Sequence, residues 1–224
     1  MSIFARQRPG RVPDIIADES EAKSYLRANV SRETFEKFEL YVGLVTKWQR
    51  AINLFGPKEL SRFWQRHMLD GYQLDQQLPD HCDKVMDVGS GGGIPGLCVA
   101  MLKPTTTIMM VERDHRKCSF LRDCARNLEL NNVHVVAKDV FALAPAEVDV
   151  VTARAFAGIS DLLSCLTRHG AEDAVGVFLK GENWFQELPL ALQQTSDLVH
   201  TQPSITDSGA VLLTVKRADV LGLE

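Results

Sequence analysis

The chain has 224 residues, of which 45% are hydrophobic and 24% charged, and its formal net charge is −4. This length suits one large domain, or one domain with a helical extension, and the composition is ordinary for a globular protein. The negative charge argues against a free-standing binder of duplex nucleic acid, whose affinity depends on neutralising many phosphates. Two local clusters of cations remain, each by itself more typical of a solvated surface: Arg6, Arg8 and Arg11, and Arg113, Arg116, Lys117 and Arg122.

Residues 1–17 are expected to form a flexible tail, because Pro9, Gly10 and Pro13 interrupt any regular element there. The first residues contain no apolar segment of the kind that secretory signals need, and the apolar run at 97–102 is too short to cross a bilayer. The cysteines stand at 82, 98, 118, 124 and 165 without a C-x-x-C pair, which favours neither a zinc site nor a disulfide framework. We therefore expect a cytoplasmic protein with buried or inert thiols and no metal site.

Residues 18–79 are predicted to form a helical extension. Ser31 is suited to cap a helix, and the apolar residues after it recur every three or four positions, which indicates one face of an amphipathic helix. These residues are Phe35, Phe38, Tyr41, Val45, Trp48 and Ile52. Pro57 interrupts the pattern, and a second helix is then indicated by Leu60, Phe63, Trp64, His67 and Leu74.

The remainder of the chain, 80–224, alternates predicted strands with predicted helices, which implies a mostly parallel sheet. The strands are expected at 84–88, 107–112, 133–137, 148–153 and 174–180, and the helices at 96–102, 116–128, 158–168 and 184–194. Near the end, Asp207-Ser208-Gly209 separates two apolar segments, 198–205 and 210–215, which predicts a hairpin. A mostly parallel sheet closed by an antiparallel hairpin is typical of class I methyltransferases and is absent from dinucleotide-binding Rossmann domains.

A glycine-rich loop, Asp87 to Gly96, joins the first predicted strand to its helix. Glycines let a ligand approach the backbone closely, and the start of the helix offers free N–H donors. The spacing of Gly89 and Gly91, with an acid two residues before, favours S-adenosylmethionine, and Glu112 at the end of the next strand is placed to bind a ribose. The loop also satisfies G-x-G-x-x-G, so a nicotinamide dehydrogenase stays a remote alternative, as does a plain turn without a ligand.

Several short motifs follow one another over about residues 35–217. They are Trp48 with Asn53-Leu54, Arg66-His67-Met68-Leu69-Asp70, the glycine loop, Phe120-Leu121, Ala153-Arg154-Ala155-Phe156-Ala157 and Leu179-Lys180-Gly181. In this order the chain closely resembles the bacterial RsmG or GidB family, which methylates N7 of a guanine in small-subunit ribosomal RNA with S-adenosylmethionine. The resemblance implies an α/β class I S-adenosylmethionine-dependent methyltransferase fold, Rossmann-like, with the methyltransferase domain at 80–224. It also implies a 16S rRNA partner, which we expect within an assembled or partly assembled 30S particle.

The resemblance and the general pattern of methyltransferases together assign the cofactor-binding residues. They are Gly89, Gly91, Ile94, Glu112, Asp139, Val140, Phe141 and Arg154. Asp139 is expected to accept a hydrogen bond from the adenine amino group, while the backbone N–H of Val140 meets the adenine ring. The chain departs from the family where Asp139 and Phe141 replace an Arg and a Glu, and where Phe55 replaces a Thr.

Three roles are open for Arg154 at the end of the fourth predicted strand. It binds the methionine end of the cofactor, or it contacts RNA, or it forms a salt bridge. Phe156 either stacks on a base or belongs to the core. His67 and Asp70, three positions apart, are interpreted as structural residues that pair with each other or with the domain beneath. Lys180 closes the fifth strand and, with Arg116 and Lys117, is a candidate contact for substrate RNA.

The predicted chemistry needs no named catalytic residue. Enzymes that methylate exocyclic amines usually carry an Asn/Asp-Pro-Pro-aromatic motif after the fourth strand, which this chain lacks. Methylation of pyrimidine carbon requires a cysteine nucleophile, and Cys165 is expected in the core. Guanine N7 carries an in-plane lone pair, so its methylation fits a site that has neither this motif nor a cysteine nucleophile. The alternatives are a methyltransferase for another substrate, and a non-catalytic ribosome-assembly protein that would not bind the cofactor.

Overall fold

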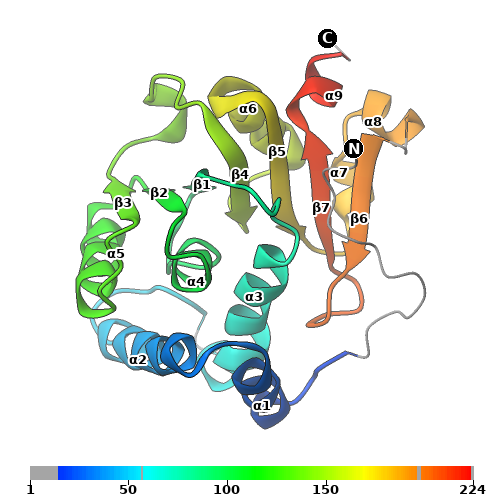
Figure 1. Ribbon diagram of the computed structural model, residues 1–224. Helices are drawn as coiled ribbons and strands as arrows, with labels where there is room; N and C mark the ends of the chain where they lie inside the picture. The colour runs from blue at the N-terminus through cyan, green and yellow to red at the C-terminus, as the bar shows by residue number, and fades with distance from the viewer. Residues whose placement is uncertain (1–14, 57, 196–197, 223–224) are drawn as a thin grey trace.

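The computed structural model describes residues 15–222 except 57 and 196–197, and within these residues seven strands form one sheet in the order β3-β2-β1-β4-β5-β7-β6 (Figure 1). The strands are β1 (Lys84–Val88), β2 (Thr107–Val111), β3 (Val133–Val136), β4 (Val148–Arg154), β5 (Gly170–Lys180), β6 (Val199–Pro203) and β7 (Val211–Lys216). Neighbours among β1 to β5 pair in parallel, whereas β7 lies antiparallel between β5 and β6. The expected class I arrangement, including its hairpin, is confirmed.

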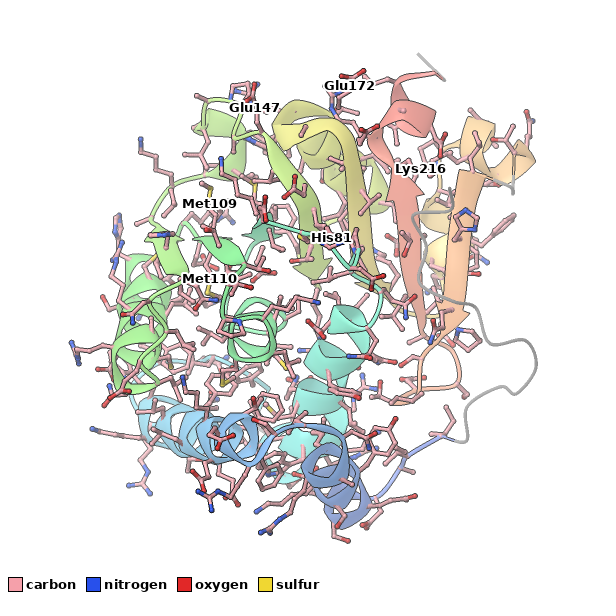
Figure 2. All side chains as sticks on the ribbon, in the orientation of Figure 1. His81, Met109, Met110, Glu147, Glu172 and Lys216 are labelled. Carbon is pink, nitrogen blue, oxygen red and sulfur yellow. The ribbon has the colours of Figure 1, made fainter. Side chains whose placement is uncertain are left out.

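Strands β1, β2, β4 and β5 carry nearly continuous apolar runs and are largely buried on both faces, whereas β6 at the edge is mostly exposed. Successive residues point to opposite faces. Met110 of β2 belongs to one hydrophobic cluster and Met109 packs against the other (Figure 2). The first cluster includes residues of α4 (Gly96–Leu102) and α5 (His115–Asn127), and the second includes residues of α6 (Ile159–His169) and α9 (Arg217–Leu221). This is a layered α/β fold, and strands β1 and β4 lie in the interior of its sheet.

The predicted extension is helical and packs on the side of the sheet that carries the first hydrophobic cluster. It consists of α1 (Glu19–Asn29), α2 (Arg32–Trp48), a 3-10 turn η1 (Leu60–Arg62), a π-helical turn η2 (Trp64–Met68) and α3 (Leu69–Asp75). Ser31 caps α2 as expected, because its side chain accepts a hydrogen bond from the N–H of Thr34 at 3.1 Å. At the other end of α2, the indole N–H of Trp48 donates to Asp123 of α5 at 2.8 Å. The extension therefore shares its core with the sheet.

The expected tail, 1–17, lies mostly outside the described residues, and so do Arg6, Arg8 and Arg11. Ile16 is buried, and its N–H donates to the carbonyl of Ile205 at 2.9 Å. The segment just before α1 thus contacts the loop between β6 and β7.

Two predicted elements differ from the structure. The single helix expected at 184–194 is two short helices, α7 (Trp184–Glu187) and α8 (Leu190–Gln194). Pro189 separates them, because proline disfavours a helical conformation at the residue before it, and Leu188 has φ −66° and ψ 140°. Strand β5 begins at Gly170 rather than at 174, and its first residues pair with the start of β4.

The cysteines at 82, 98, 118, 124 and 165 are free and buried, as expected. Burial raises the pKa of the Cys165 thiol to about 12, so this side chain is an inert part of the core. In the described part of the chain, no helix is both long and apolar enough to span a membrane.

A buried polar network joins α3 to the end of β4. The carboxylate of Asp70 lies 3.0 Å from Nε of Arg154, and its other oxygen accepts from Thr206 at 2.7 Å and from Gln73 at 3.0 Å. Both charged side chains are largely buried, at 8% and 16% exposure. Such a pair is favourable only when its remaining polar atoms are hydrogen-bonded, which Thr206 and Gln73 achieve for Asp70. Of the roles considered for Asp70, pairing with the domain beneath is the one that the structure shows.

Replacing Arg154 with alanine should therefore lower the free energy of unfolding by about 3 kcal/mol, because Asp70 would remain buried without its cation. Urea denaturation measures this change. The control is Arg126→Ala, which removes an exposed cation from its pair with Asp123 and should cost less than about 1 kcal/mol. Equal stabilities of the two variants would show that the Asp70–Arg154 pair contributes little.

Candidate functional site

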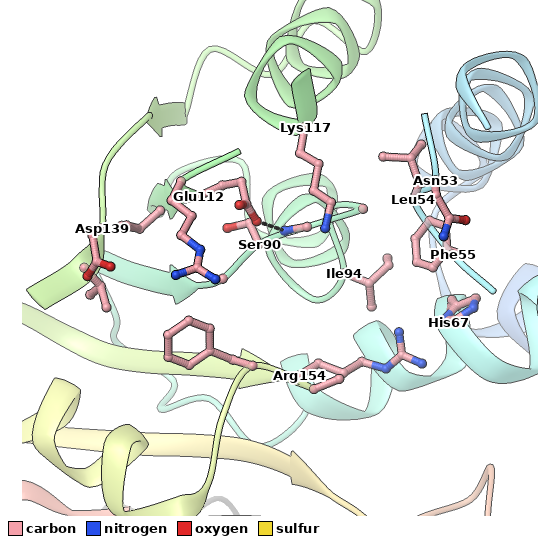
Figure 3. Close-up of a pocket in the computed structure, with 18 of the residues that line it drawn as sticks. Asn53, Leu54, Phe55, His67, Ser90, Ile94, Glu112, Lys117, Asp139 and Arg154 are labelled. Atoms are coloured by element: carbon pink, nitrogen blue, oxygen red, sulfur yellow. Dashed lines mark hydrogen bonds between the residues drawn. The ribbon is translucent and has the colours of Figure 1, made fainter. Parts of the chain in front are cut away.

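A cavity of about 620 Å³ opens at the carboxyl edge of the sheet, where β1, β2 and β4 end (Figure 3). This edge is where open α/β sheets bind their ligands. The residues that the cofactor prediction names all border the cavity: Gly89, Gly91, Ile94, Glu112, Asp139, Val140, Phe141 and Arg154. The structure thus brings these predicted residues together, while their contacts with a cofactor stay a prediction.

The glycine loop presents bare backbone to the cavity. Gly91 has φ +50°, a conformation that L side chains rarely adopt. A Cβ atom built on Gly91 would meet only the carbonyl oxygen of Gly89, at 3.6 Å, so the space above this residue is open. A ligand can therefore lie directly against the loop at this point.

Glu112, which follows β2, fixes the loop from one side. One carboxylate oxygen accepts from the N–H of Gly91 at 2.9 Å, and the other accepts from the N–H of Asp114 at 2.8 Å. The side chain is buried apart from 8% of its surface, which borders the cavity. Each carboxylate oxygen has a further lone pair, so Glu112 can accept hydroxyl hydrogen bonds without releasing the loop.

The segment after β3 forms one end of the cavity. Asp139 caps the 3-10 turn η3 (Val140–Ala142), because its carboxylate accepts from the N–H of Phe141 at 2.9 Å. Val140 is buried and its carbonyl lies 3.1 Å from Nε2 of His169, while the Phe141 ring is 44% exposed. An acidic side chain beside an exposed aromatic ring suits the polar edge and the face of an adenine.

Asp87 lies beneath the loop rather than in the cavity wall. Its side chain is fully buried, one oxygen accepts from the hydroxyl of Thr152 at 3.1 Å, and the other has no partner among the described residues. Burial raises the pKa of Asp87 to about 7. The Asp87 carbonyl also accepts from Ser90 at 2.9 Å, so the acid of the motif supports the loop from below.

Arg154 forms part of the wall, but its guanidinium is directed into the protein. It pairs with Asp70 and also lies 3.4 Å from the carbonyl of Arg66. Of the three roles considered for this residue, the structure shows the salt bridge, with a partner on α3. The guanidinium has further N–H donors, so a contact between Arg154 and the cofactor stays a prediction.

The predicted RNA contacts fall into two groups. Lys180 is largely buried, and its ammonium donates to the carbonyl of Ala157 at 3.2 Å and to Glu187 at 2.5 Å. This internal pairing fixes the loop after β4 and leaves little of Lys180 for RNA. Lys117 borders the cavity, and Arg116, one residue before it on α5, has an exposed side chain.

Phe156 borders the cavity and packs on the glycine loop, since a Cβ on Gly89 would lie 2.2 Å from its ring.

The opposite end of the cavity comes from the extension, which the sequence did not place at the site. Its cavity residues are Asn53, Leu54, Phe55, Gly56, Glu59 and His67. The side chain of Gln49 holds this segment, accepting from the N–H groups of Leu54 and Phe55 at 2.9 and 3.1 Å. The hydroxyl of Tyr41 donates to the carbonyl of Gly92, in the glycine loop. The signals for this end in the sequence are the Asn53-Leu54 motif and the Arg66–Asp70 motif that contains His67, because helical periodicity does not show which loop reaches the sheet edge.

The cap on η3 gives a test of Asp139. Asparagine can retain the cap, so Asp139→Asn should weaken S-adenosylmethionine binding only if the charged carboxylate itself accepts from the adenine. We expect a loss of about 1 kcal/mol for Asp139→Asn and more for Asp139→Ala, which also removes the cap. Calorimetric titration measures both. If both variants bind S-adenosylmethionine with wild-type affinity, the side chain of Asp139 has no role in cofactor binding.

The fold is shared with solved methyltransferases of low sequence identity. A methyltransferase from Geobacter sulfurreducens is 16% identical and matches with a TM-score of 0.55, covering 92% of this chain and 99% of that one. The ribosomal protein L11 methylase of Lactobacillus delbrueckii subsp. bulgaricus is 14% identical, with a TM-score of 0.55 over 73% of this chain and 81% of that one. These matches establish the fold of the domain.

The sequence relatives are much closer. Ribosomal RNA small subunit methyltransferase G of Paramagnetospirillum magneticum is 40% identical over 190 residues, which cover 85% of this chain and 92% of that protein. The protein of the same name from Cereibacter sphaeroides is 39% identical over 192 residues, covering 84% and 93%. The family model GidB, rRNA small subunit methyltransferase G, matches residues 34–209. The chain therefore belongs to the GidB family and is a methyltransferase with the class I, S-adenosylmethionine-dependent fold.

Proposed function

We propose that the protein transfers a methyl group from S-adenosylmethionine to N7 of a guanine in the RNA of the small ribosomal subunit. The observation that carries this proposal is the cavity at the carboxyl edge of the sheet, which joins the glycine loop, Glu112 and the Asp139–Phe141 segment in a chain of the GidB family. The names of the relatives indicate the substrate, which is the RNA of the small ribosomal subunit, and the cavity is where we expect the reaction to take place.

The residues of the cavity fit the methyl donor. Glu112 binds the ribose hydroxyls, Asp139 accepts from the adenine amino group, and the bare backbone at Gly91 lies under the remainder of the cofactor. The acidic side chain and the exposed ring of Phe141 suit the adenine. Gly89, Ile94, Val140 and Arg154 complete this proposed set.

The reaction requires positioning rather than a base. Bound S-adenosylmethionine supplies a sulfonium methyl group, to which the N7 lone pair forms a bond while the electrons of the C–S bond return to sulfur. No proton has to leave the guanine. The cysteines of the chain are buried and none of them borders the cavity, so no thiol is available for attack on a pyrimidine. A rigid wall that holds N7 against the methyl carbon can supply most of the catalysis.

The charge of the protein bears on the form of its substrate. With a net charge of −4, the chain cannot rely on bulk electrostatics to find one guanine in RNA. Lys117 at the cavity and the exposed Arg116 provide local positive charge on α5. We infer that the enzyme recognises the shape of an assembled or partly assembled 30S particle in the cytoplasm.

Binding of the donor is the first test. S-adenosylmethionine at about 100 times its dissociation constant should stabilise the native state by about 2.7 kcal/mol, whereas NADH should have no effect. Glu112→Ala should weaken donor binding by about 1–3 kcal/mol, because the ribose loses a charged acceptor and the N–H of Gly91 loses its partner. Thermal unfolding with each ligand measures both effects. A shift with NADH and none with the methyl donor would contradict the assignment.

The methylated atom is the second test. Purified protein should transfer label from S-adenosylmethionine to small subunits from cells that lack the gene, and strand scission at N7-methylguanosine should map the label to one guanine. Subunits from cells with the gene serve as the control and should accept little label. Label on an exocyclic amine, on a pyrimidine or on protein would refute guanine N7 as the acceptor.

A further inference from the structure

The end of the cavity formed by the extension contains a histidine whose ring makes no hydrogen bond within the described structure. His67 of η2 is 1% exposed and borders the cavity, and both of its ring nitrogens are buried without a partner. Buried polar atoms in native proteins nearly always have partners, and each exception calls for an explanation. Two such atoms on one side chain beside a binding cavity point to a partner that enters through the cavity.

The surroundings of His67 hold its ring in place and keep it neutral. The ring lies between Phe55 and Phe63, with centroid distances of 4.4 and 4.8 Å. Burial, together with the positive charges of Arg154 and Arg66, lowers the pKa of His67 to about 2. A neutral imidazole offers one N–H donor and one acceptor nitrogen, so His67 is a positioned hydrogen-bonding group without charge.

A carboxylate lies next to this ring. Glu59 borders the same end of the cavity, and its Oε2 is 4.0 Å from Nε2 of His67, which is beyond hydrogen-bonding distance. The same oxygen accepts from the N–H of Gly56 at 2.7 Å, which fixes the carboxylate, and the side chain is 42% exposed. The cavity end thus presents a neutral donor beside an acceptor that carries negative charge.

This pair fits the Watson–Crick edge of guanine. Guanine presents the O6 acceptor next to the N1–H and N2–H donors, so a neutral N–H can bind O6 while a carboxylate accepts from N1–H and N2–H. Adenine and cytosine can also pair with a donor beside an acceptor, but each offers the carboxylate only one amino group, whereas guanine offers it the adjacent N1–H and N2–H donors. Reading a base through its Watson–Crick edge is how enzymes that act on single bases select them.

The position of the pair agrees with this role. Figure 3 shows Asp139 and Glu112 toward one end of the cavity and Phe55 with His67 at the other, with Ile94 between them. Under the proposed function, the adenosine of the donor occupies the first end. The second end is then left for the acceptor base, whose O6 neighbours N7.

We propose that His67 and Glu59 form the guanine-binding end of the cavity, in which His67 donates a hydrogen bond to O6 and Glu59 accepts from N1–H and N2–H. This inference rests on the proposed function and adds the residues that select the base. Both side chains touch the substrate, and neither is needed for binding the methyl donor.

The test compares four variants in three measurements. His67→Leu removes both nitrogens at similar volume, His67→Gln restores a side-chain N–H, and Glu59→Gln removes the charge. Trp64→Phe is the control, because Trp64 is buried in the same π-helical turn and stacks on Phe35, away from the cavity. The measurements are the thermal midpoint, the affinity for S-adenosylmethionine, and the single-turnover rate at saturating donor over a range of unmodified small-subunit concentrations.

We expect His67→Leu to unfold at or above the wild-type midpoint, since it removes unpaired polar atoms from the interior. Its affinity for the donor should stay within about twofold of wild type, while methylation falls by about tenfold to a hundredfold, because O6 loses its donor. His67→Gln should recover part of this rate. Glu59→Gln should also slow methylation, and Trp64→Phe should retain the wild-type rate and donor affinity.

Three results would overturn the inference. His67→Leu could methylate at the wild-type rate, it could lose donor affinity in parallel with methylation, or both His67 variants could unfold far below the wild-type midpoint, which would make His67 a structural residue. A wild-type protein that binds the donor and labels no guanine would instead refute the proposed function. The measurements on the wild-type protein therefore distinguish a failure of this inference from a failure of the proposed function.

Discussion

The buried ion pair between Asp70 and Arg154 is the contact on which the shape of the cavity depends. It joins α3 of the extension to the last residue of β4, at the edge where the sheet binds ligands. Thr206 and Gln73 occupy the other oxygen of Asp70, so the pair is satisfied on the protein side and has one geometry. Because the pair fixes both elements, the distance between the glycine loop and the extension is set before any ligand binds.

The glycine loop is held from two sides. Glu112 binds the loop at Gly91 from the direction of β2, and Tyr41 binds it at Gly92 from the direction of α2. The Phe55 ring also packs directly on Gly92, where an added Cβ would lie 2.2 Å from the ring. A loop so rich in glycine would be mobile by itself, and these contacts prepare it for the cofactor. Catalysis by positioning requires this kind of preorganisation.

The extension is therefore part of the site and not an accessory to the methyltransferase domain. It shares the first hydrophobic cluster with α4 and α5, and it supplies one complete end of the cavity. Two cations that a reading of the sequence would direct toward RNA are used inside the protein instead. Arg154 pairs with Asp70, and Lys180 pairs with Glu187. This leaves Arg113, Lys117 and Lys138 as other cations that border the cavity, with the exposed Arg116 next to Lys117 on α5.

The sequence by itself determined the order of strands and helices, the hairpin, the glycine loop and the acid at Glu112. These features are local, because apolar runs, helical periodicity and turn residues act over a few positions. β1 and α4 begin and end where the pattern predicts them, and even the break in the helix expected at 184–194 has a local cause in Pro189.

Only the tertiary structure decided which charged groups pair and which polar groups stay unpaired. Asp70 and Arg154 meet because α3 lies against the end of β4, and His67 lies at the cavity beside Phe55, whose ring packs on Gly92 of the glycine loop. The motif that contains His67 and Asp70 suggests that they pair with each other or with the domain beneath. The fold pairs Asp70 with Arg154 and leaves the ring nitrogens of His67 without a hydrogen bond among the described residues. Pairing between distant side chains depends on how whole elements pack, and no spacing along the chain encodes it.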